Sequence, residues 1–184
     1  MEIFDDLETE YGRLDRIFGG LSDADWAAPS ACEGWSVVDV LLHLAQTEET
    51  VIATVTGAPR KPDGLAPDRG EMSVDEAMGR WVEAERAGPE VVYPRWQAAR
   101  LKSVEVLRAA DPDKASAWAS APLRPATMAT TRLAEHWAHA LDITGPLGID
   151  YPDTARLRHI ARLAFRTLPY AFQVAGEQPG PVRV

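Results

Sequence analysis

Three side chains of the kinds that bind transition metals occur on two segments with helical periodicity: His43, Glu135 and His139. Glu135 and His139 are four residues apart, so on a helix they project about 40° from one another, separated by one turn, and can share an ion. His43 is the only other histidine on a predicted inward face. Two imidazoles and one carboxylate leave positions open on zinc, as catalytic sites do. The spacing therefore predicts a metal site able to support chemistry.

His136 offers an alternative to this set. It is three residues from His139 and could share an ion with it, but it diverges from Glu135 by about 100°, too far for both to join one site on a regular helix. We favour Glu135 with His139, which leaves His136 as a candidate catalytic base or an alternate ligand. Apolar residues four apart predict the packed face beside the site: Leu133, Trp137 and Leu141.

Simpler roles stay open for each of these residues. A histidine on an apolar face is more often a hydrogen-bonded core residue than a ligand, and Glu135 could pair with Arg132 or His139 on its own helix. Cys32 reads as a loop thiol, because no neighbouring charge pattern in the sequence would activate it. His159 reads as an exposed helix residue.

The composition excludes several classes of partner. The 184 residues carry a net charge of −9, and no Lys/Arg cluster could neutralise a row of phosphates, so we expect no nucleic acid. We also expect no membrane, because no basic amphipathic segment and no apolar run of spanning length occurs. The single cysteine excludes an intrachain disulfide, and the acidic start is unlike a signal peptide. A cytoplasmic location is expected.

The elements that must position the site are helices. Apolar periodicity predicts helices over about 3–21, 37–56, 73–110, 127–144 and 153–175. The third is expected to be interrupted or kinked near Gly88-Pro89 and Pro94, and the fourth to end at Gly145-Pro146. Breaker-rich loops are expected over 57–70 and 111–126. The resulting fold class is all-α, four long helices plus an additional C-terminal helix. Residues 1–176 form the expected domain. Residues 177–184 form a tail, which is either the start of a truncated second domain or the end of a single-domain relative.

Two of these helices begin with a capping pattern. Ser36 is followed three residues later by Asp39, and Ser73 by Glu76. In such a box the serine side chain caps the helix and the acidic side chain bonds back to the serine backbone.

Two motifs together resemble the metal-binding domain of mycothiol-dependent maleylpyruvate isomerases, within the DinB-like superfamily of helical-bundle metalloproteins. They are the segment from Gly34 to Leu44, GWSVVDVLLHL, and the segment from Arg132 to Asp142, RLAEHWAHALD. The resemblance spans about residues 1–175. It implies a DinB-like four-helix bundle, and it places the family's metal ligands on His43, Glu135 and His139.

The resemblance also implies an enzyme, an isomerase or transferase in which one divalent metal activates mycothiol or another small thiol toward an electrophilic substrate. Zinc is expected, with nickel, iron or cobalt as alternatives. A metal-dependent hydrolase using a bound water, or a non-catalytic metal- or ligand-binding bundle, remains open, and so does a homodimer. Asp39 and Asp142, each about one turn from a histidine, could accept the ring N–H that faces away from the metal.

Overall fold

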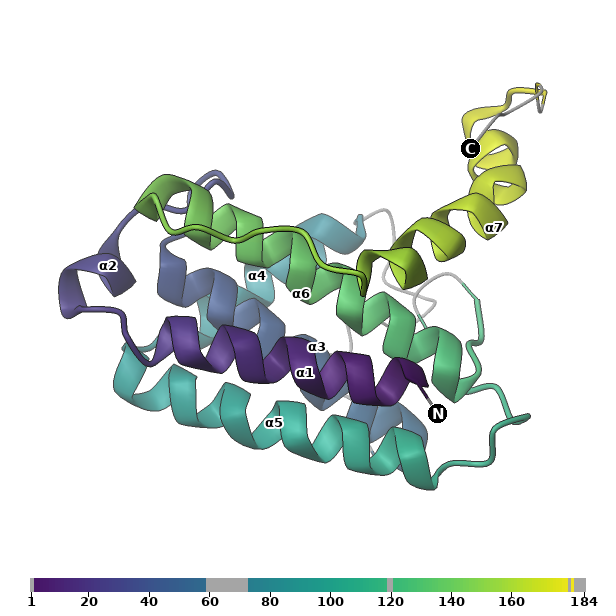
Figure 1. The fold of residues 1–184 in the computed structure, drawn as a ribbon, viewed down its shortest axis with the longest axis horizontal. Coiled ribbons are helices and arrows are strands. Elements are labelled where there is room, and N and C mark those ends of the chain that lie inside the picture. The colour runs from purple at the N-terminus through teal and green to yellow at the C-terminus, as the bar shows by residue number, and fades with distance from the viewer. Residues whose placement is uncertain (1, 59–72, 119–120, 179, 181–184) are drawn as a thin grey trace. The chain divides into compact units, whose positions relative to one another are not determined.

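The computed structural model describes residues 2–58, 73–118, 121–178 and 180. Its helices are α1 (Glu2–Phe18), α2 (Asp23–Ala27), α3 (Val37–Thr56), α4 (Val74–Glu85), α5 (Pro89–Ala109), α6 (Pro125–Leu147) and α7 (Leu157–Ala175). Four long helices, α1, α3, α5 and α6, form the bundle (Figure 1). Among the described residues the only extended pairings are two isolated bridges, Pro29 with Ser36 and Ser116 with Leu123. The all-α prediction is confirmed.

Both predicted capping boxes are formed. The Ser36 side chain accepts from the Asp39 backbone N–H, and the Asp39 carboxylate accepts from the Ser36 N–H. Ser73 and Glu76 make the same reciprocal pair at the start of α4. These bonds satisfy amide groups that a helix N-terminus leaves without intrahelical partners. They set the start of α3 one turn before Asp39, and this start fixes the register of His43 along the helix.

The structure decides one open alternative and corrects one helix boundary. Near Gly88-Pro89 the predicted helical segment is interrupted rather than kinked, because α4 ends at Glu85 and Pro89 opens α5. Proline suits a first helical turn, where its missing N–H has no intrahelical acceptor to lose. The helix predicted to stop at Gly145-Pro146 continues to Leu147, and Gly148 closes it with a positive φ of 66°. Proline therefore lies inside α6 without ending it.

The bundle core is built from one apolar face of each long helix. α3 makes its most extensive contacts with α5, and α1 packs mainly on α6. Burying these side chains supplies the main driving force for folding. The largest fully buried side chains are Trp96, Tyr11, Phe18, Leu7, Leu14, Leu41, Leu42, Leu44, Leu107, Met128, Leu133 and Ile143. α3, which carries His43, and α6, which carries Glu135 and His139, both contribute to this list, so core packing fixes the positions of these two helices.

The contacts divide the chain into two compact units, Met1–Tyr151 and Pro152–Val184. The bundle is the first unit, and α7 belongs to the second. The predicted single domain of residues 1–176 stays a prediction, and most of the predicted loop 57–70 and of the tail 177–184 lies outside the described residues. Within the described part of the chain, no helix is both long enough and apolar enough to cross a membrane.

Candidate metal centre

The structure brings together the three predicted ligands. His43 lies on α3, and Glu135 and His139 lie one turn apart on α6. His43 Nε2 is 3.0 Å from Glu135 Oε1, and His139 Nε2 is 3.6 Å from the same oxygen. The two imidazole rings meet edge to face, with centroids 4.9 Å apart. We call these three residues the His-Glu-His cluster.

The cluster has donors and spacing that fit a divalent ion. Its ligand atoms all lie within 4.8 Å of one another. Around a tetrahedral zinc with bonds of about 2.0–2.1 Å, neighbouring nitrogen and oxygen ligands are about 3.3 Å apart, close to the two distances observed here. The His43 side chain is 8% exposed, whereas that of Glu135 is 36% exposed. The cluster is therefore exposed to solvent on the α6 side.

Charge on α6 prepares Glu135 as an anion. Burial opposes ionisation of this carboxyl, but hydrogen bonds from His139 and His43 and the charge of Arg132 together hold its pKa well below the usual range. Arg132 Nη2 lies 3.5 Å from Glu135 Oε2, on the opposite side of the carboxylate from the histidines. One carboxylate oxygen therefore faces the imidazoles while the other faces the guanidinium.

A buried ion pair with Glu48 holds Arg132 next to Glu135. Arg132 Nε is 3.4 Å from Glu48 Oε1, and both side chains are almost completely excluded from solvent. Burial raises the pKa of Glu48, and the charge of Arg132 opposes that rise. Arg132 therefore lies between two carboxylates, one in the core and one at the cluster. The ion pair fixes the guanidinium at a defined distance from Glu135.

The cluster histidines have opposite environments. Burial lowers the pKa of His43. Burial also acts against charge on His139, but hydrogen bonds and charge from Glu135 and Asp142 outweigh it and raise the His139 pKa. His139 Nδ1 donates to Asp142 Oδ2 at 2.9 Å. A metal bound at Nε2 would replace the proton that faces Glu135, while Nδ1 would keep its own proton for the hydrogen bond to Asp142.

Asp39 does not accept a hydrogen bond from His43 in the way that Asp142 accepts one from His139. One Asp39 oxygen accepts from Ser36, and the other accepts from Arg86 Nε at 3.1 Å. The carboxylate serves the helix cap and an ion pair, and His43 Nδ1 is buried without a hydrogen-bond partner among the described residues. Of the two aspartates that the sequence analysis considers as acceptors for a histidine N–H, only Asp142 forms a hydrogen bond with a histidine of the cluster.

His136 faces the bundle core. Its side chain is fully buried, its Nε2 accepts from Trp96 Nε1 at 3.1 Å, and its Nδ1 donates to the Arg132 backbone carbonyl at 3.0 Å. Burial lowers its pKa to about 3, which keeps the ring neutral. Both nitrogens are committed to protein partners, so this geometry supports a packing role. The catalytic role suggested by the sequence stays a prediction.

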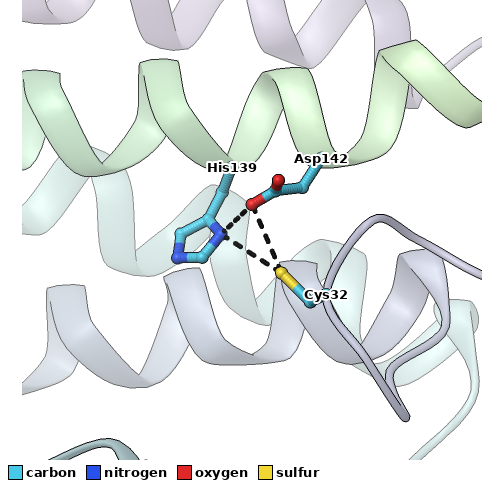
Figure 2. A group of neighbouring side chains, drawn as sticks. All are labelled: Cys32, His139 and Asp142. Atoms are coloured by element: carbon cyan, nitrogen blue, oxygen red, sulfur yellow. Dashed lines mark hydrogen bonds and ion pairs between the residues drawn. The ribbon is translucent and has the colours of Figure 1, made fainter.

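Sequence reasoning missed two neighbours of the cluster. Cys32 lies beside His139 and Asp142, 107 and 110 residues away along the chain (Figure 2). Glu48 forms an ion pair with Arg132. Glu48 follows the apolar Leu44 by four residues on α3, so the helical period places it on the inward face, and a glutamate on that face was a usable signal. Nothing local to Cys32 indicated its partners.

Comparisons with known proteins identify the family of the chain. Residues 7–144 match the family model described as mycothiol maleylpyruvate isomerase N-terminal domain. Two uncharacterized proteins from two strains of Mycobacterium tuberculosis are each 33% identical over 184 residues, which covers 95% of this chain and 67% of the relative.

A solved structure shares the fold. It is the crystal structure of a histidine-to-alanine mutant of the mycothiol-dependent maleylpyruvate isomerase, with a TM-score of 0.70 and 14% identity over 97% of this chain and 73% of that one. The family model covers both motifs that carry the cluster, and the structural match covers nearly the whole chain. The chain therefore belongs to the mycothiol maleylpyruvate isomerase N-terminal domain family, and its bundle has the DinB-like helical fold.

Proposed function

We propose that this chain is a divalent-metal-dependent enzyme domain that activates a small thiol of the mycothiol type for isomerisation of, or transfer to, an electrophile. The observation that carries the proposal is the convergence of His43 Nε2, Glu135 Oε1 and His139 Nε2 on one partly open site. Family membership supports the thiol, because the matched family and the solved structure are both described by their relation to mycothiol.

The charge balance of the site favours an anionic ligand. A divalent ion bound there would supply the positive charge that stabilises a thiolate over a thiol. Glu135 would offset one of the ion's two positive charges, and the nearby Arg132 is shared between Glu135 and the buried Glu48. The cluster therefore keeps a net positive character toward an incoming group, and a sulfur anion suits a borderline-soft ion.

The chain's own residues have separate tasks in this proposal. His43 is the buried ligand, and α3 fixes its position. Glu135 and His139 lie on the more exposed side, 36% and 19% exposed, where substrate would approach. Asp142 accepts the Nδ1 proton of His139 at 2.9 Å and so fixes the tautomer and orientation of the ring.

Cobalt substitution tests the proposal. Metal-free protein is loaded with cobalt, and mycothiol or a simpler thiol is added at millimolar concentration. A thiolate that coordinates the ion produces a sulfur-to-cobalt charge-transfer band and alters the visible d–d bands, whereas the matching alcohol does neither. Zinc, nickel and iron loading, followed by assay with maleylpyruvate and thiol, then identifies the metal that supports turnover.

Matched variants separate the cluster from general effects on folding. Glu135→Gln keeps the shape of the side chain and removes its charge, so it should lose cobalt affinity. Glu105→Gln removes a surface carboxylate whose ion pair, among the residues that the structure describes, is the exposed one with Lys102, and this variant should bind cobalt normally. His159→Ala should also keep the metal. Cobalt binding with no spectral response to any thiol would contradict thiol activation and favour hydrolysis or simple ligand binding.

A further inference from the structure

The side of His139 that faces away from Glu135 carries a second set of ligand atoms. Cys32 Sγ lies 3.8 Å from His139 Nδ1 and 3.3 Å from Asp142 Oδ2, and these two atoms are 2.9 Å apart. Figure 2 shows the thiol and the carboxylate converging on Nδ1. One imidazole therefore lies between two groups of candidate ligands. Its Nε2 faces the His-Glu-His cluster, and its Nδ1 faces Cys32 and Asp142.

The loop that carries Cys32 is fixed to α6. Pro146 has no N–H to donate to the carbonyl of Asp142 four residues earlier, so that carbonyl is left without its usual helical partner. The Ala31 backbone N–H donates to it at 2.9 Å. Cys32 N donates to Ser30 Oγ at 3.1 Å, and the Cys32 carbonyl accepts from the Trp35 N–H at 3.0 Å. Hydrogen bonds of its N–H and its carbonyl therefore fix the backbone of Cys32, and this backbone positions the sulfur.

The distances fit a thiolate-containing metal site. Around tetrahedral zinc, ligands bonded at about 2.3 Å for sulfur and about 2.0–2.1 Å for nitrogen or oxygen lie about 3.3–3.6 Å from one another. The three distances here, 3.8, 3.3 and 2.9 Å, require adjustments of only a few tenths of an ångström. His139 is 19% exposed and Asp142 is 30% exposed, so an ion has an entry path.

We propose that Cys32, His139 Nδ1 and Asp142 form a second metal site that takes a thiophilic divalent cation such as cadmium or excess zinc. Sulfur donors favour such ions over hard cations such as magnesium or calcium. The ion takes the places of the Cys32 thiol proton and of the Nδ1 proton, and the thiol proton leaves to solvent. The remaining ring proton is then on Nε2, which faces Glu135 Oε1.

Sharing one imidazole makes the two sites exclusive. A neutral ring offers one lone pair, so His139 serves either the His-Glu-His cluster through Nε2 or the Cys32 site through Nδ1. An ion at the Cys32 site withdraws one ligand from the cluster and acts as an inhibitor that competes with the functional metal. This competition rests on the function proposed above, whereas the existence of the Cys32 site does not.

Cadmium titration of the full chain tests the site. Because Cys32 is the only cysteine, any sulfur-to-cadmium charge-transfer band in reduced, metal-free protein reports on this residue alone. The band should saturate at one cadmium per chain. It should vanish in Cys32→Ala and persist in His43→Ala, which disrupts only the other cluster. In Asp142→Asn the cadmium affinity, measured from the titration of this band, should fall by about tenfold or more.

Two results would overturn the proposal. A wild-type protein that binds cadmium without the band has no thiolate ligand at that ion. A band that is unchanged in Asp142→Asn shows a solvent-exposed thiol binding cadmium by itself. The competition is tested on the cobalt-loaded chain, where cadmium should remove the d–d bands in wild type at lower concentration than in Cys32→Ala. Failure of cobalt to bind would refute the function proposed above and leave the cadmium result intact.

Discussion

Removal of the Asp142 side chain tests whether a single outer carboxylate controls metal affinity at the His-Glu-His cluster. Asp142 Oδ2 accepts from His139 Nδ1 at 2.9 Å. In Asp142→Ala the ring loses this acceptor, so it can rotate about its side-chain bonds and its Nδ1 proton is no longer fixed. The backbone carbonyl of residue 142 remains, so the Ala31 N–H keeps its acceptor and the Cys32 loop keeps its anchor.

The expected loss follows from the usual effect of such partners. Carboxylates that orient ligating histidines typically contribute 10–100-fold to metal affinity, or about 1.4–2.7 kcal/mol. Asp142→Asn should fall between wild type and Asp142→Ala, because an amide oxygen still accepts from Nδ1 but carries no charge. Cys32→Ala removes only a neutral S–H donor to Asp142, so it should change zinc affinity by less than about 1 kcal/mol.

Zinc affinity is measured by competition with a chromophoric chelator at constant pH, and circular dichroism shows that each variant is folded. Asp113→Ala is the matched control, because that side chain is 84% exposed and its ion pair in the described structure is with Arg124 at 3.5 Å. A folded Asp142→Ala protein with wild-type zinc affinity would refute the reasoning. That result would show that core packing alone orients His139.

Two further predictions concern stability. Asp15 is partly buried, but hydrogen bonds from two α5 side chains and the charge of Arg100 lower its pKa, so its contribution to stability is present above about pH 4 and is lost as the pH falls through its folded pKa. Asp15→Asn should therefore cost about 1 kcal/mol in urea unfolding at neutral pH and progressively less as the pH falls below about 4, whereas a loss that does not change with pH would contradict the charge argument. Arg132→Met leaves Glu48 buried without its cation, which should lower the free energy of unfolding by about 3–5 kcal/mol. Adding Glu48→Leu should recover most of that loss, because no unpaired charge then remains in the core. A double variant as unstable as the single one would show that packing rather than charge is responsible.

The sequence alone determined the local features of this protein. Serine-to-acid spacing defined where α3 and α4 begin, because capping bonds join residues three positions apart. Helical geometry likewise fixed the angle between Glu135 and His139, and it directed His136 away from Glu135. The boundary at Gly145-Pro146 was wrong because a proline in the last turn removes one hydrogen bond without preventing the helix from continuing to its glycine cap.

Only the tertiary structure decided which distant residues meet. His43 and Glu135 are 92 residues apart and Cys32 and His139 are 107 apart, and no local rule relates their side chains. Their contacts depend on how α3 and α6 pack in the bundle and on a loop anchored to the carbonyl that Pro146 leaves free. Sequence spacing fixes angles within one helix, whereas the distance between two helices depends on the volumes of all the core side chains packed between them.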